Sequence, residues 1–471
     1  MIPITTIPQT IWTKIQAYRK LFCTNVGFEH IARYITGLIV SPNKTLQGIH
    51  DIQVWPNGNK ISSRAMHEAV FEAGWQSDEL MPHHRKLLGT KYKGKSRYII
   101  SLDWTHGHHD RGPKIFGVKK SYDYVNGRHG LFQTVLTATV ANAERQDGIE
   151  IEIQQPFELA KEKSYLKATA GQNYDTLEAA RERLLELLHY EIHRRSYRKI
   201  TEMAVDVVRK IEDENHFPQA DYAFDNGVLN LDLTREIENR SKQWTSELES
   251  SRHINWKGVW RRIDGVAAEL KQQHPESFRR VEYPTRSGEI KICWGFSKAV
   301  RLKKYGKKRI LIVHEKEDLS DKPCFLVTSA LHWEAKRILT SWSYRWSCEI
   351  FHEFGKQSVG FEAAQVRKEE AVKRHFRLSC VAQSFLQDIA PPVSTSEKFL
   401  FAEGQATQGQ RERVVVREVL LGMLAFAQQS FVAGKNLLEV LDLLMPVWCG
   451  LCYFVVVSLL FVGYDIQSRI I

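Results

Sequence analysis

One stretch of the chain places an acid between two bases at helical spacing. Trp342, Arg345, Glu349 and Lys356 fall within an arc of roughly 60° on one helical face, at about 100° per residue. A carboxylate framed by cations stays ionised, so Glu349 can bind a hard divalent metal while Arg345 and Lys356 bind phosphates. A simple i,i+4 ion pair on a surface helix would show the same spacing. The assignment therefore depends on acids elsewhere in the chain.

Two aspartates complete a set of three acids, because each follows a short apolar run that predicts a buried strand. Residues 98–102 lead into Asp103, and residues 222–224 lead into Asp225. Side chains at strand ends converge on a ligand in an open α/β sheet. Three carboxylates can hold two Mg²⁺ or Mn²⁺ ions about 3.5–4 Å apart around a scissile phosphate. We predict that Asp103, Asp225 and Glu349 are catalytic and metal-binding, with two ions in the site.

The elements that must position these acids alternate in α/β order, and the predicted fold class is α/β. Strands are expected at 98–102, 114–118, 131–140, 222–224, 279–284, 289–296, 309–314 and 324–328, and helices at 176–189, 200–211, 342–356 and 369–387. Residues 1–95 have helical spacing with basic residues interspersed, which favours a helical DNA-binding region.

The arginine–glutamate–lysine spacing resembles the glutamate motif of DDE transposases of the bacterial insertion-sequence type. That motif reads tyrosine, two residues, arginine, three residues, glutamate, six residues, lysine. Arg345, Glu349 and Lys356 match it in register, and Trp342 stands at the tyrosine position. Asp103-Trp104-Thr105 and Phe224-Asp225-Asn226-Gly227 resemble the aspartate motifs, and residues 373–378 resemble the helix that follows the glutamate. The resemblance covers about residues 95–390.

The resemblance implies an RNase H-like catalytic core that is interrupted by a β-rich insertion. The implied layout is a mostly helical N-terminal DNA-binding region at 1–95, the first part of the core at 96–242, a β-rich basic insertion at 243–322, the second part of the core at 323–392, and a helical C-terminal region with an apolar tail at 393–471.

The implied activity is metal-dependent cleavage at the ends of an insertion sequence, followed by transfer of the 3′-hydroxyl ends into target DNA. Double-stranded DNA is the expected partner, and two protomers are expected to pair the element ends. The side chains expected to contact DNA are Arg345, Lys356, Trp342, His352, Lys303, Lys304 and Lys307. An exposed tryptophan of the insertion could also stack on a displaced base, although each is more often part of a core.

Three alternatives remain at this stage. An RNase H-like structure-selective nuclease would cut DNA without joining it, and a catalytically inactive relative would only bind it. The uncharged segment Leu443–Tyr464 is long enough to span a membrane. We favour a packed core, an oligomer contact or an atypical tail for this segment and do not expect a membrane partner. His106–Asp110 has the residue types of a transition-metal site, but its glycine and charged neighbours favour a loop beside the active site.

The composition agrees with a folded, basic, cytoplasmic protein that associates with the nucleoid. The 471 residues include 66 Lys and Arg against 55 Asp and Glu, which gives a net charge of +11 and suits a polyanionic partner. Seven scattered cysteines offer no disulfide framework, and Cys449 and Cys452 lack the further ligands of a zinc site. The N-terminus has no long apolar run typical of a secretory signal.

Overall fold

The computed structural model describes residues 2–55, 61–94, 97–109, 112–123, 127–155, 175–390 and 407–445. The chain divides into two compact units. Unit 1 combines Met1–Gly74 with Ile389–Ile471, and unit 2 is Trp75–Asp388. Both ends of the chain thus belong to one unit.

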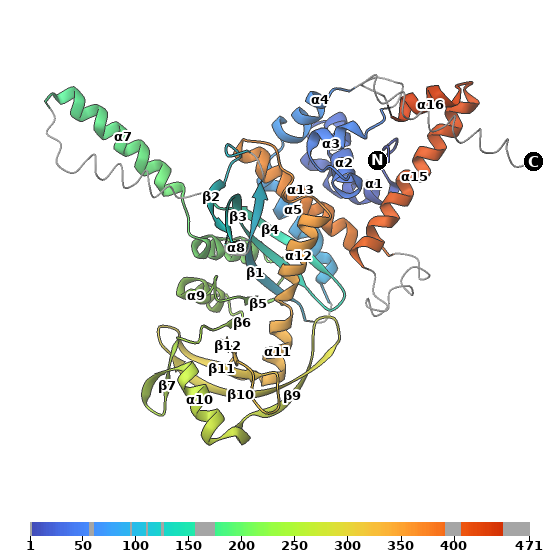
Figure 1. The fold of residues 1–471 in the computed structure, drawn as a ribbon. Coiled ribbons are helices and arrows are strands. Elements are labelled where there is room, and N and C mark those ends of the chain that lie inside the picture. The colour runs from blue at the N-terminus through green and yellow to red at the C-terminus, as the bar shows by residue number, and fades with distance from the viewer. Residues whose placement is uncertain are drawn as a thin grey trace, which may run out of the picture. The chain divides into compact units, whose positions relative to one another are not determined.

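Unit 2 is built on a mixed sheet, so the protein is α/β as predicted (Figure 1). Its strands are β1 (Ile99–His109), β2 (Val118–Asp123), β3 (Arg128–Ala141), β4 (Gln146–Ile153), β5 (Asp221–Phe224), β6 (Trp244–Glu247), β7 (His253–Trp256), β8 (Val259–Arg262), β9 (Arg279–Pro284), β10 (Ile290–Leu302), β11 (Gly306–His314) and β12 (Cys324–Thr328). The strand order is β2-β3-β1-β5-β6-β12-β11-β10-β7-β8, with β4 paired to β3 and β9 to β10.

The central strands bring their carboxyl ends to one edge of the sheet. β3 is antiparallel to both β1 and β4, whereas β5 is parallel to both β1 and β6. Leu102 pairs with Phe224, the last residue of β5. From Asp103 to His109, β1 therefore continues beyond the end of β5, paired with β3 alone among the described strands. The strands expected at 98–102, 131–140 and 222–224 are confirmed. Residues 114–117 form turns, so the strand expected at 114–118 is wrong. Gly112, with a φ of 94°, precedes these turns, and Gly117, with a φ of 81°, ends them.

Alternate residues of β1 and β3 face opposite sides of the sheet, as the two-residue period of a strand requires. Ile100 and Leu102 lie in the main hydrophobic core with Leu136 of β3 and Val208 of the helix α8 (Ile200–Glu214). The positions between them carry small polar side chains instead. These include Ser101, Thr137 and Thr139, which are buried against α12 (Trp346–Gln357).

The remaining helices of unit 2 are α5 (Ser77–Tyr92), α7 (Leu177–Ser196), α9 (Leu231–Asn239), α10 (Ile263–Gln273), the 3₁₀ turn η4 (Pro275–Ser277), α11 (Ala335–Ser343) and α13 (Glu369–Gln387). The helices expected at 176–189, 200–211 and 369–387 are confirmed as α7, α8 and α13. A single helix expected at 342–356 is instead divided into α11 and α12 by a turn at Tyr344 and Arg345.

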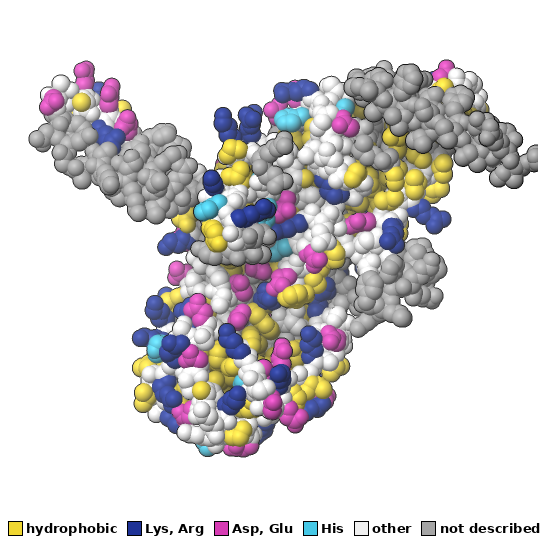
Figure 2. Space-filling model, viewed as in Figure 1, with side chains coloured by type: hydrophobic (Ala, Val, Ile, Leu, Met, Phe, Trp, Pro, Cys, Tyr) yellow, Lys and Arg dark blue, Asp and Glu magenta, His cyan; other side chains and the backbone are white. Residues whose placement is uncertain are grey.

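The residues expected to form the insertion extend the same sheet. β6 pairs with β5, and the strands expected at 279–284, 289–296, 309–314 and 324–328 are confirmed as β9 to β12. Trp244 and Trp256 are buried there, whereas Trp260 is 47% exposed. Figure 2 shows Lys and Arg side chains interspersed with Asp and Glu over this part of the molecule. The face in view is therefore of mixed charge.

Unit 1 is helical in the residues that are described. Its helices are α1 (Gln9–Ile15), η1 (Gln16–Leu21), α2 (Asn25–Val40), α3 (Leu46–Asp51), α4 (Ser63–His67), the π-helix η3 (Glu68–Glu72), α15 (Gln408–Val432) and α16 (Leu437–Leu444). By length and composition, α15 is the one described helix that could cross a membrane. Most of the apolar segment 443–464, and both Cys449 and Cys452, lie outside the described residues.

Candidate active site

The three predicted acids come together at the edge where the parallel strands end. Asp103 is the first residue of β1 beyond its pairing with β5, Asp225 follows β5 directly, and Glu349 lies in the first turn of α12. Burial, followed by the negative charge of Asp225, raises the pKa of the Asp103 carboxyl to about 7. Glu349 acts in the same direction, which shows that all three carboxylates are within electrostatic reach.

Arg345 links two of these acids from the turn before α12. Its Nη2 donates to Oε1 of Glu349, and its Nη1 lies 3.6 Å from Oδ2 of Asp103. The guanidinium carbon also lies 5.0 Å from the ring centroid of Trp342, a cation–π contact. Trp342 packs in turn against the apolar cluster of β11, β12 and α11. The tryptophan at the position of the family's tyrosine thus supports Arg345 directly.

The Asp225 carboxylate is held by its own turn. Its Oδ1 accepts hydrogen bonds from the backbone N–H groups of Gly227, at 3.0 Å, and Val228, at 3.3 Å. The Ser246 hydroxyl donates to the Asp225 carbonyl oxygen at 3.3 Å. The turn signal in Asp225-Asn226-Gly227 and the role in the site are therefore compatible. β6 ends one residue after Ser246, so Glu247 adds a fourth acid to this edge of the sheet.

His352, on the face of α12 that packs on β3, contacts Thr137 next to Asp103. Its Nε2 lies 2.6 Å from the Thr137 hydroxyl oxygen, and that hydroxyl donates to the Asp103 carbonyl oxygen at 3.3 Å. The Thr137 hydroxyl therefore lies between the His352 ring and the Asp103 backbone. Burial, with the charges of Lys356 and Arg345, lowers the pKa of His352 to about 3, so the imidazole is neutral. The side chain is buried rather than presented to DNA, and its place in the structure is that of a positioning residue.

The lysines predicted to contact DNA are not all near the acids. Lys356 lies on α12, and its Nζ is 3.4 Å from Oε1 of Glu362. Lys303, Lys304 and Lys307 are exposed at the turn between β10 and β11. The cross-strand residue pairs that run from β11 through β12, β6 and β5 to β1 place Arg309 of β11 in register with Ser101 of β1. The β10–β11 turn therefore lies toward the opposite end of the sheet from Asp103.

A divalent metal suits the donor set of this site. Three carboxylates lie near one cation, Arg345, which contacts Glu349 and Asp103. Burial first, and then the charge of Asp225, raises the pKa of the Asp103 carboxyl. Among the described residues, no group of three or more His, Cys, Asp or Glu side chains is arranged to hold a metal ion as it stands. Arg345 contacts Oε1 of Glu349, which leaves the second carboxylate oxygen without a partner in this ion pair.

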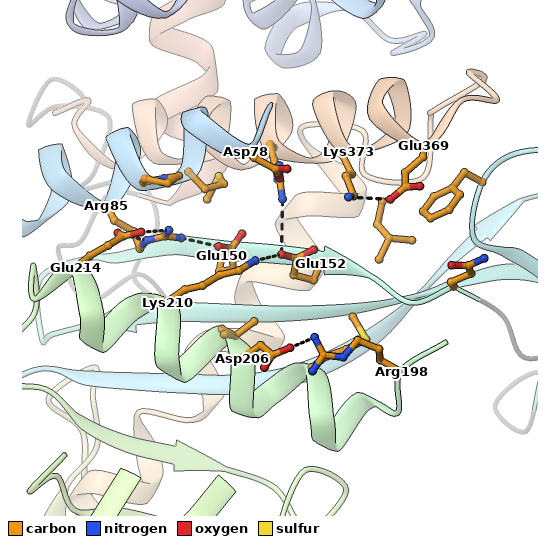
Figure 3. A pocket seen from close by; sticks show the side chains of 18 residues that line it. Asp78, Arg85, Glu150, Glu152, Arg198, Asp206, Lys210, Glu214, Glu369 and Lys373 are labelled. Carbon is orange, nitrogen blue, oxygen red and sulfur yellow. Dashed lines mark hydrogen bonds and ion pairs between the residues drawn. The ribbon is translucent and has the colours of Figure 1, made fainter. Parts of the chain in front are cut away.

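A cavity of about 550 Å³ lies elsewhere, between α5, β4, α8 and α13 (Figure 3). Its charged side chains pair with one another: Arg85 with Glu150 and Glu214, and Lys210 with Glu152. Glu150 and Glu152 are paired in register with Ala138 and Leu136, which face the main core rather than α12. The cavity is therefore on the other side of the sheet from Asp103, and its charges are compensated internally.

Sequence reasoning did not find Thr137, Ser246 or Glu247. The available signal for Thr137 was alternation in β3, where hydroxyl side chains at 137 and 139 interrupt an apolar strand at every second position. Ser246 and Glu247 had none, because residues 244–247 were assigned to the insertion rather than to the central sheet.

Comparisons with known proteins do not identify a family. No family model and no curated protein matches the chain. Among solved structures, the chain is similar to the NurA nuclease from Sulfolobus solfataricus at 11% identity, over 66% of this chain and 93% of that chain, with a TM-score of 0.19. At this TM-score the likeness carries no argument about fold or function.

Proposed function

We propose that the protein is a DNA transposase of the DDE type, with Asp103, Asp225 and Glu349 as its catalytic acids. The observation that carries the proposal is the convergence of these three side chains, from two strand ends and a helix, beside Arg345. The strand order β4-β3-β1-β5-β6, three antiparallel strands extended by two parallel ones, is also what an RNase H-like core requires.

The proposed reaction has two steps of phosphoryl transfer. Water attacks a phosphodiester at the end of the element, and the P–O bond to the 3′ oxygen breaks to leave a 3′-hydroxyl. That hydroxyl then attacks a phosphodiester of the target DNA and displaces its 3′ oxygen. Two Mg²⁺ or Mn²⁺ ions bound by the three acids would activate the attacking oxygen and stabilise the leaving oxygen.

The chain's own residues orient the site for this chemistry. The Trp104 N–H, at 2.8 Å from Oδ1, fixes the Asp103 carboxylate, and Thr137 fixes its backbone. Glu349, Asp103 and Asp225 would hold the metal ions, and the Arg345 guanidinium beside them would bind a DNA phosphate. Lys356, 27% exposed on that helix, would serve a second phosphate.

The test is a transfer assay on the DNA that flanks the gene on both sides, supplied with Mg²⁺, target plasmid and the full-length chain. Cleavage at the element ends and joined products in the target support the proposal. Cleavage without joining would favour a structure-selective nuclease on the same core, and DNA binding without cleavage an inactive relative. Either result would overturn the transposase assignment.

A further inference from the structure

The helix α7 presents apolar side chains to solvent. Leu177, Leu184, Leu185 and Leu188 are 90%, 66%, 59% and 56% exposed. A helix of a soluble protein normally buries its apolar face against another element, and a 20-residue helix on its own is only marginally stable in water. The leucines of α7 therefore call for a partner surface.

The exposed leucines belong to a row of positions with the spacing of a coiled coil. The intervals along this row are four, three, four, three and four residues, and its members are Leu177, Arg181, Leu184, Leu188, Glu191 and Arg195. At about 100° per residue they fall within an arc of about 80°, and we call them the α7 seam. The side chains at 191 and 195 lie outside the described residues, and their places on the face follow from the helix, which continues to Ser196.

The charges on the two faces of α7 differ in how they are paired. On the face opposite the seam, Nη1 of Arg183 lies 2.6 Å from Oε2 of Glu186, an ion pair within the helix. Arg181 of the seam is exposed, and it has no hydrogen bond or ion pair among the described residues. The guanidinium of Arg181 is thus available to an acid on a partner that covers the leucines.

Two copies of α7 fit together in antiparallel orientation, about a twofold axis level with residue 186. Leu184 of one copy then lies level with Leu188 of the second copy, at the centre of the pair. Arg181 of one copy lies level with Glu191 of the second copy, and the twofold axis repeats both pairs. The reversed seam therefore complements itself in both apolar contact and charge.

The same charges disfavour a parallel pair in register. Each seam position would then meet its own copy, so Arg181 would face Arg181 and Glu191 would face Glu191. Like charges at facing positions are repulsive, whereas opposite charges at a seam specify orientation and register. The seam thus selects the antiparallel arrangement.

We propose that α7 is a self-association surface, on which a second copy of this chain docks through an antiparallel pair of α7 helices. The pairing needs neither DNA nor metal, so the inference goes beyond the proposed function and does not rest on it. It also assigns a surface to the pairing of two protomers that the resemblance implies.

The test is sedimentation equilibrium of the full-length chain without DNA, where the wild type should form a reversible dimer. Arg181→Glu and Glu191→Arg each place like charges at both charged pairs, and each should weaken dimerisation about tenfold or more. The double variant, and an equimolar mixture of the two single variants, restore opposite charges and should return to within about threefold of the wild type. Arg183→Glu is the matched control on the opposite face and should stay within about twofold.

Rescue by the mixture also shows that both single variants are folded, and far-ultraviolet circular dichroism of each variant checks its helix content. The inference is overturned if the wild type is monomeric at every concentration, because the leucines then contact another part of the same chain. It is also overturned if Arg181→Glu and Glu191→Arg dimerise as tightly as the wild type, if Arg183→Glu weakens the dimer equally, or if the mixture restores nothing.

The two proposals fail separately. A chain that dimerises through α7 but cleaves no flanking DNA with Mg²⁺ would sink the proposed function and leave the self-association surface intact. A chain that cleaves and joins DNA while Arg181→Glu leaves its dimerisation unchanged would do the reverse.

Discussion

Thr137→Val tests the hydrogen-bond relay that holds Asp103 in place. Valine has nearly the shape of threonine and suits a strand, so the change removes the hydroxyl without opening a cavity. The lost hydroxyl leaves Nε2 of His352 buried without its 2.6 Å hydrogen-bond partner and removes the hydroxyl that lies 3.3 Å from the Asp103 carbonyl oxygen. An unsatisfied buried donor or acceptor costs about 1–3 kcal/mol, so the free energy of unfolding should fall by about that amount.

The assay for Thr137→Val is denaturant unfolding together with metal-dependent DNA cleavage. Thr139→Val is the matched control, because its hydroxyl is equally buried but contacts Ser347 and Cys348 at 3.1 Å rather than His352 and the Asp103 backbone. Both valines should lower stability, but only Thr137→Val should also lower the cleavage rate, and Thr137→Ser should restore it. Equal cleavage rates for the two valine variants would refute the relay.

Further predictions concern charge and packing. Burial lowers the folded-state pKa of His84 and of His375 to about 4, below the ordinary value of 6.5. Between these two pKa values the unfolded chain binds protons more readily than the folded chain. The stability that both histidines contribute is therefore fully present above pH 6.5 and is lost as the pH falls toward 4. Denaturation at stepped pH measures this loss, and a free energy of unfolding that does not change with pH would contradict the prediction. Arg85→Met should lower the free energy of unfolding by about 3–5 kcal/mol, because it leaves the buried Glu150 carboxylate without its ion-pair partner. Adding Glu150→Gln should recover part of this loss. An unchanged denaturation midpoint for Arg85→Met would count against the ion-pair network. Trp342→Tyr should preserve the cation–π contact with Arg345 and the cleavage rate, whereas Trp342→Ala should lower the rate; equal rates would remove Trp342 from the support of Arg345.

The sequence predicted the elements that hold the site where local patterns were strong. The apolar runs before Asp103 and Asp225 are β1 and β5, and the long amphipathic pattern at 369–387 is α13. The i,i+4 pairing of Arg345 with Glu349 is present even though the helix is interrupted at Arg345, because the intervening turn keeps helical dihedral angles.

Other features depend on contacts that no local pattern records. β6 is a four-residue strand whose place beside β5 is set by pairing across the sheet, and residues 244–247 were therefore assigned to the insertion. His352 shares a helical face with Glu349 in the sequence, but α12 packs that position onto Thr137. Lys303, Lys304 and Lys307 form a basic cluster in the sequence, yet the register of β10 and β11 carries them away from the acids. His106–His109, expected in a loop, continues β1.

The most direct measurement of the central claim is Mg²⁺-dependent cleavage of the flanking DNA by the wild-type chain and by Asp103→Asn, Asp225→Asn and Glu349→Gln. Each substitution preserves shape while removing a charge, so each should reduce the cleavage rate by about 10³-fold or more and leave duplex DNA binding within about twofold. Cleavage by Glu349→Gln at the wild-type rate would contradict the catalytic role of the three acids.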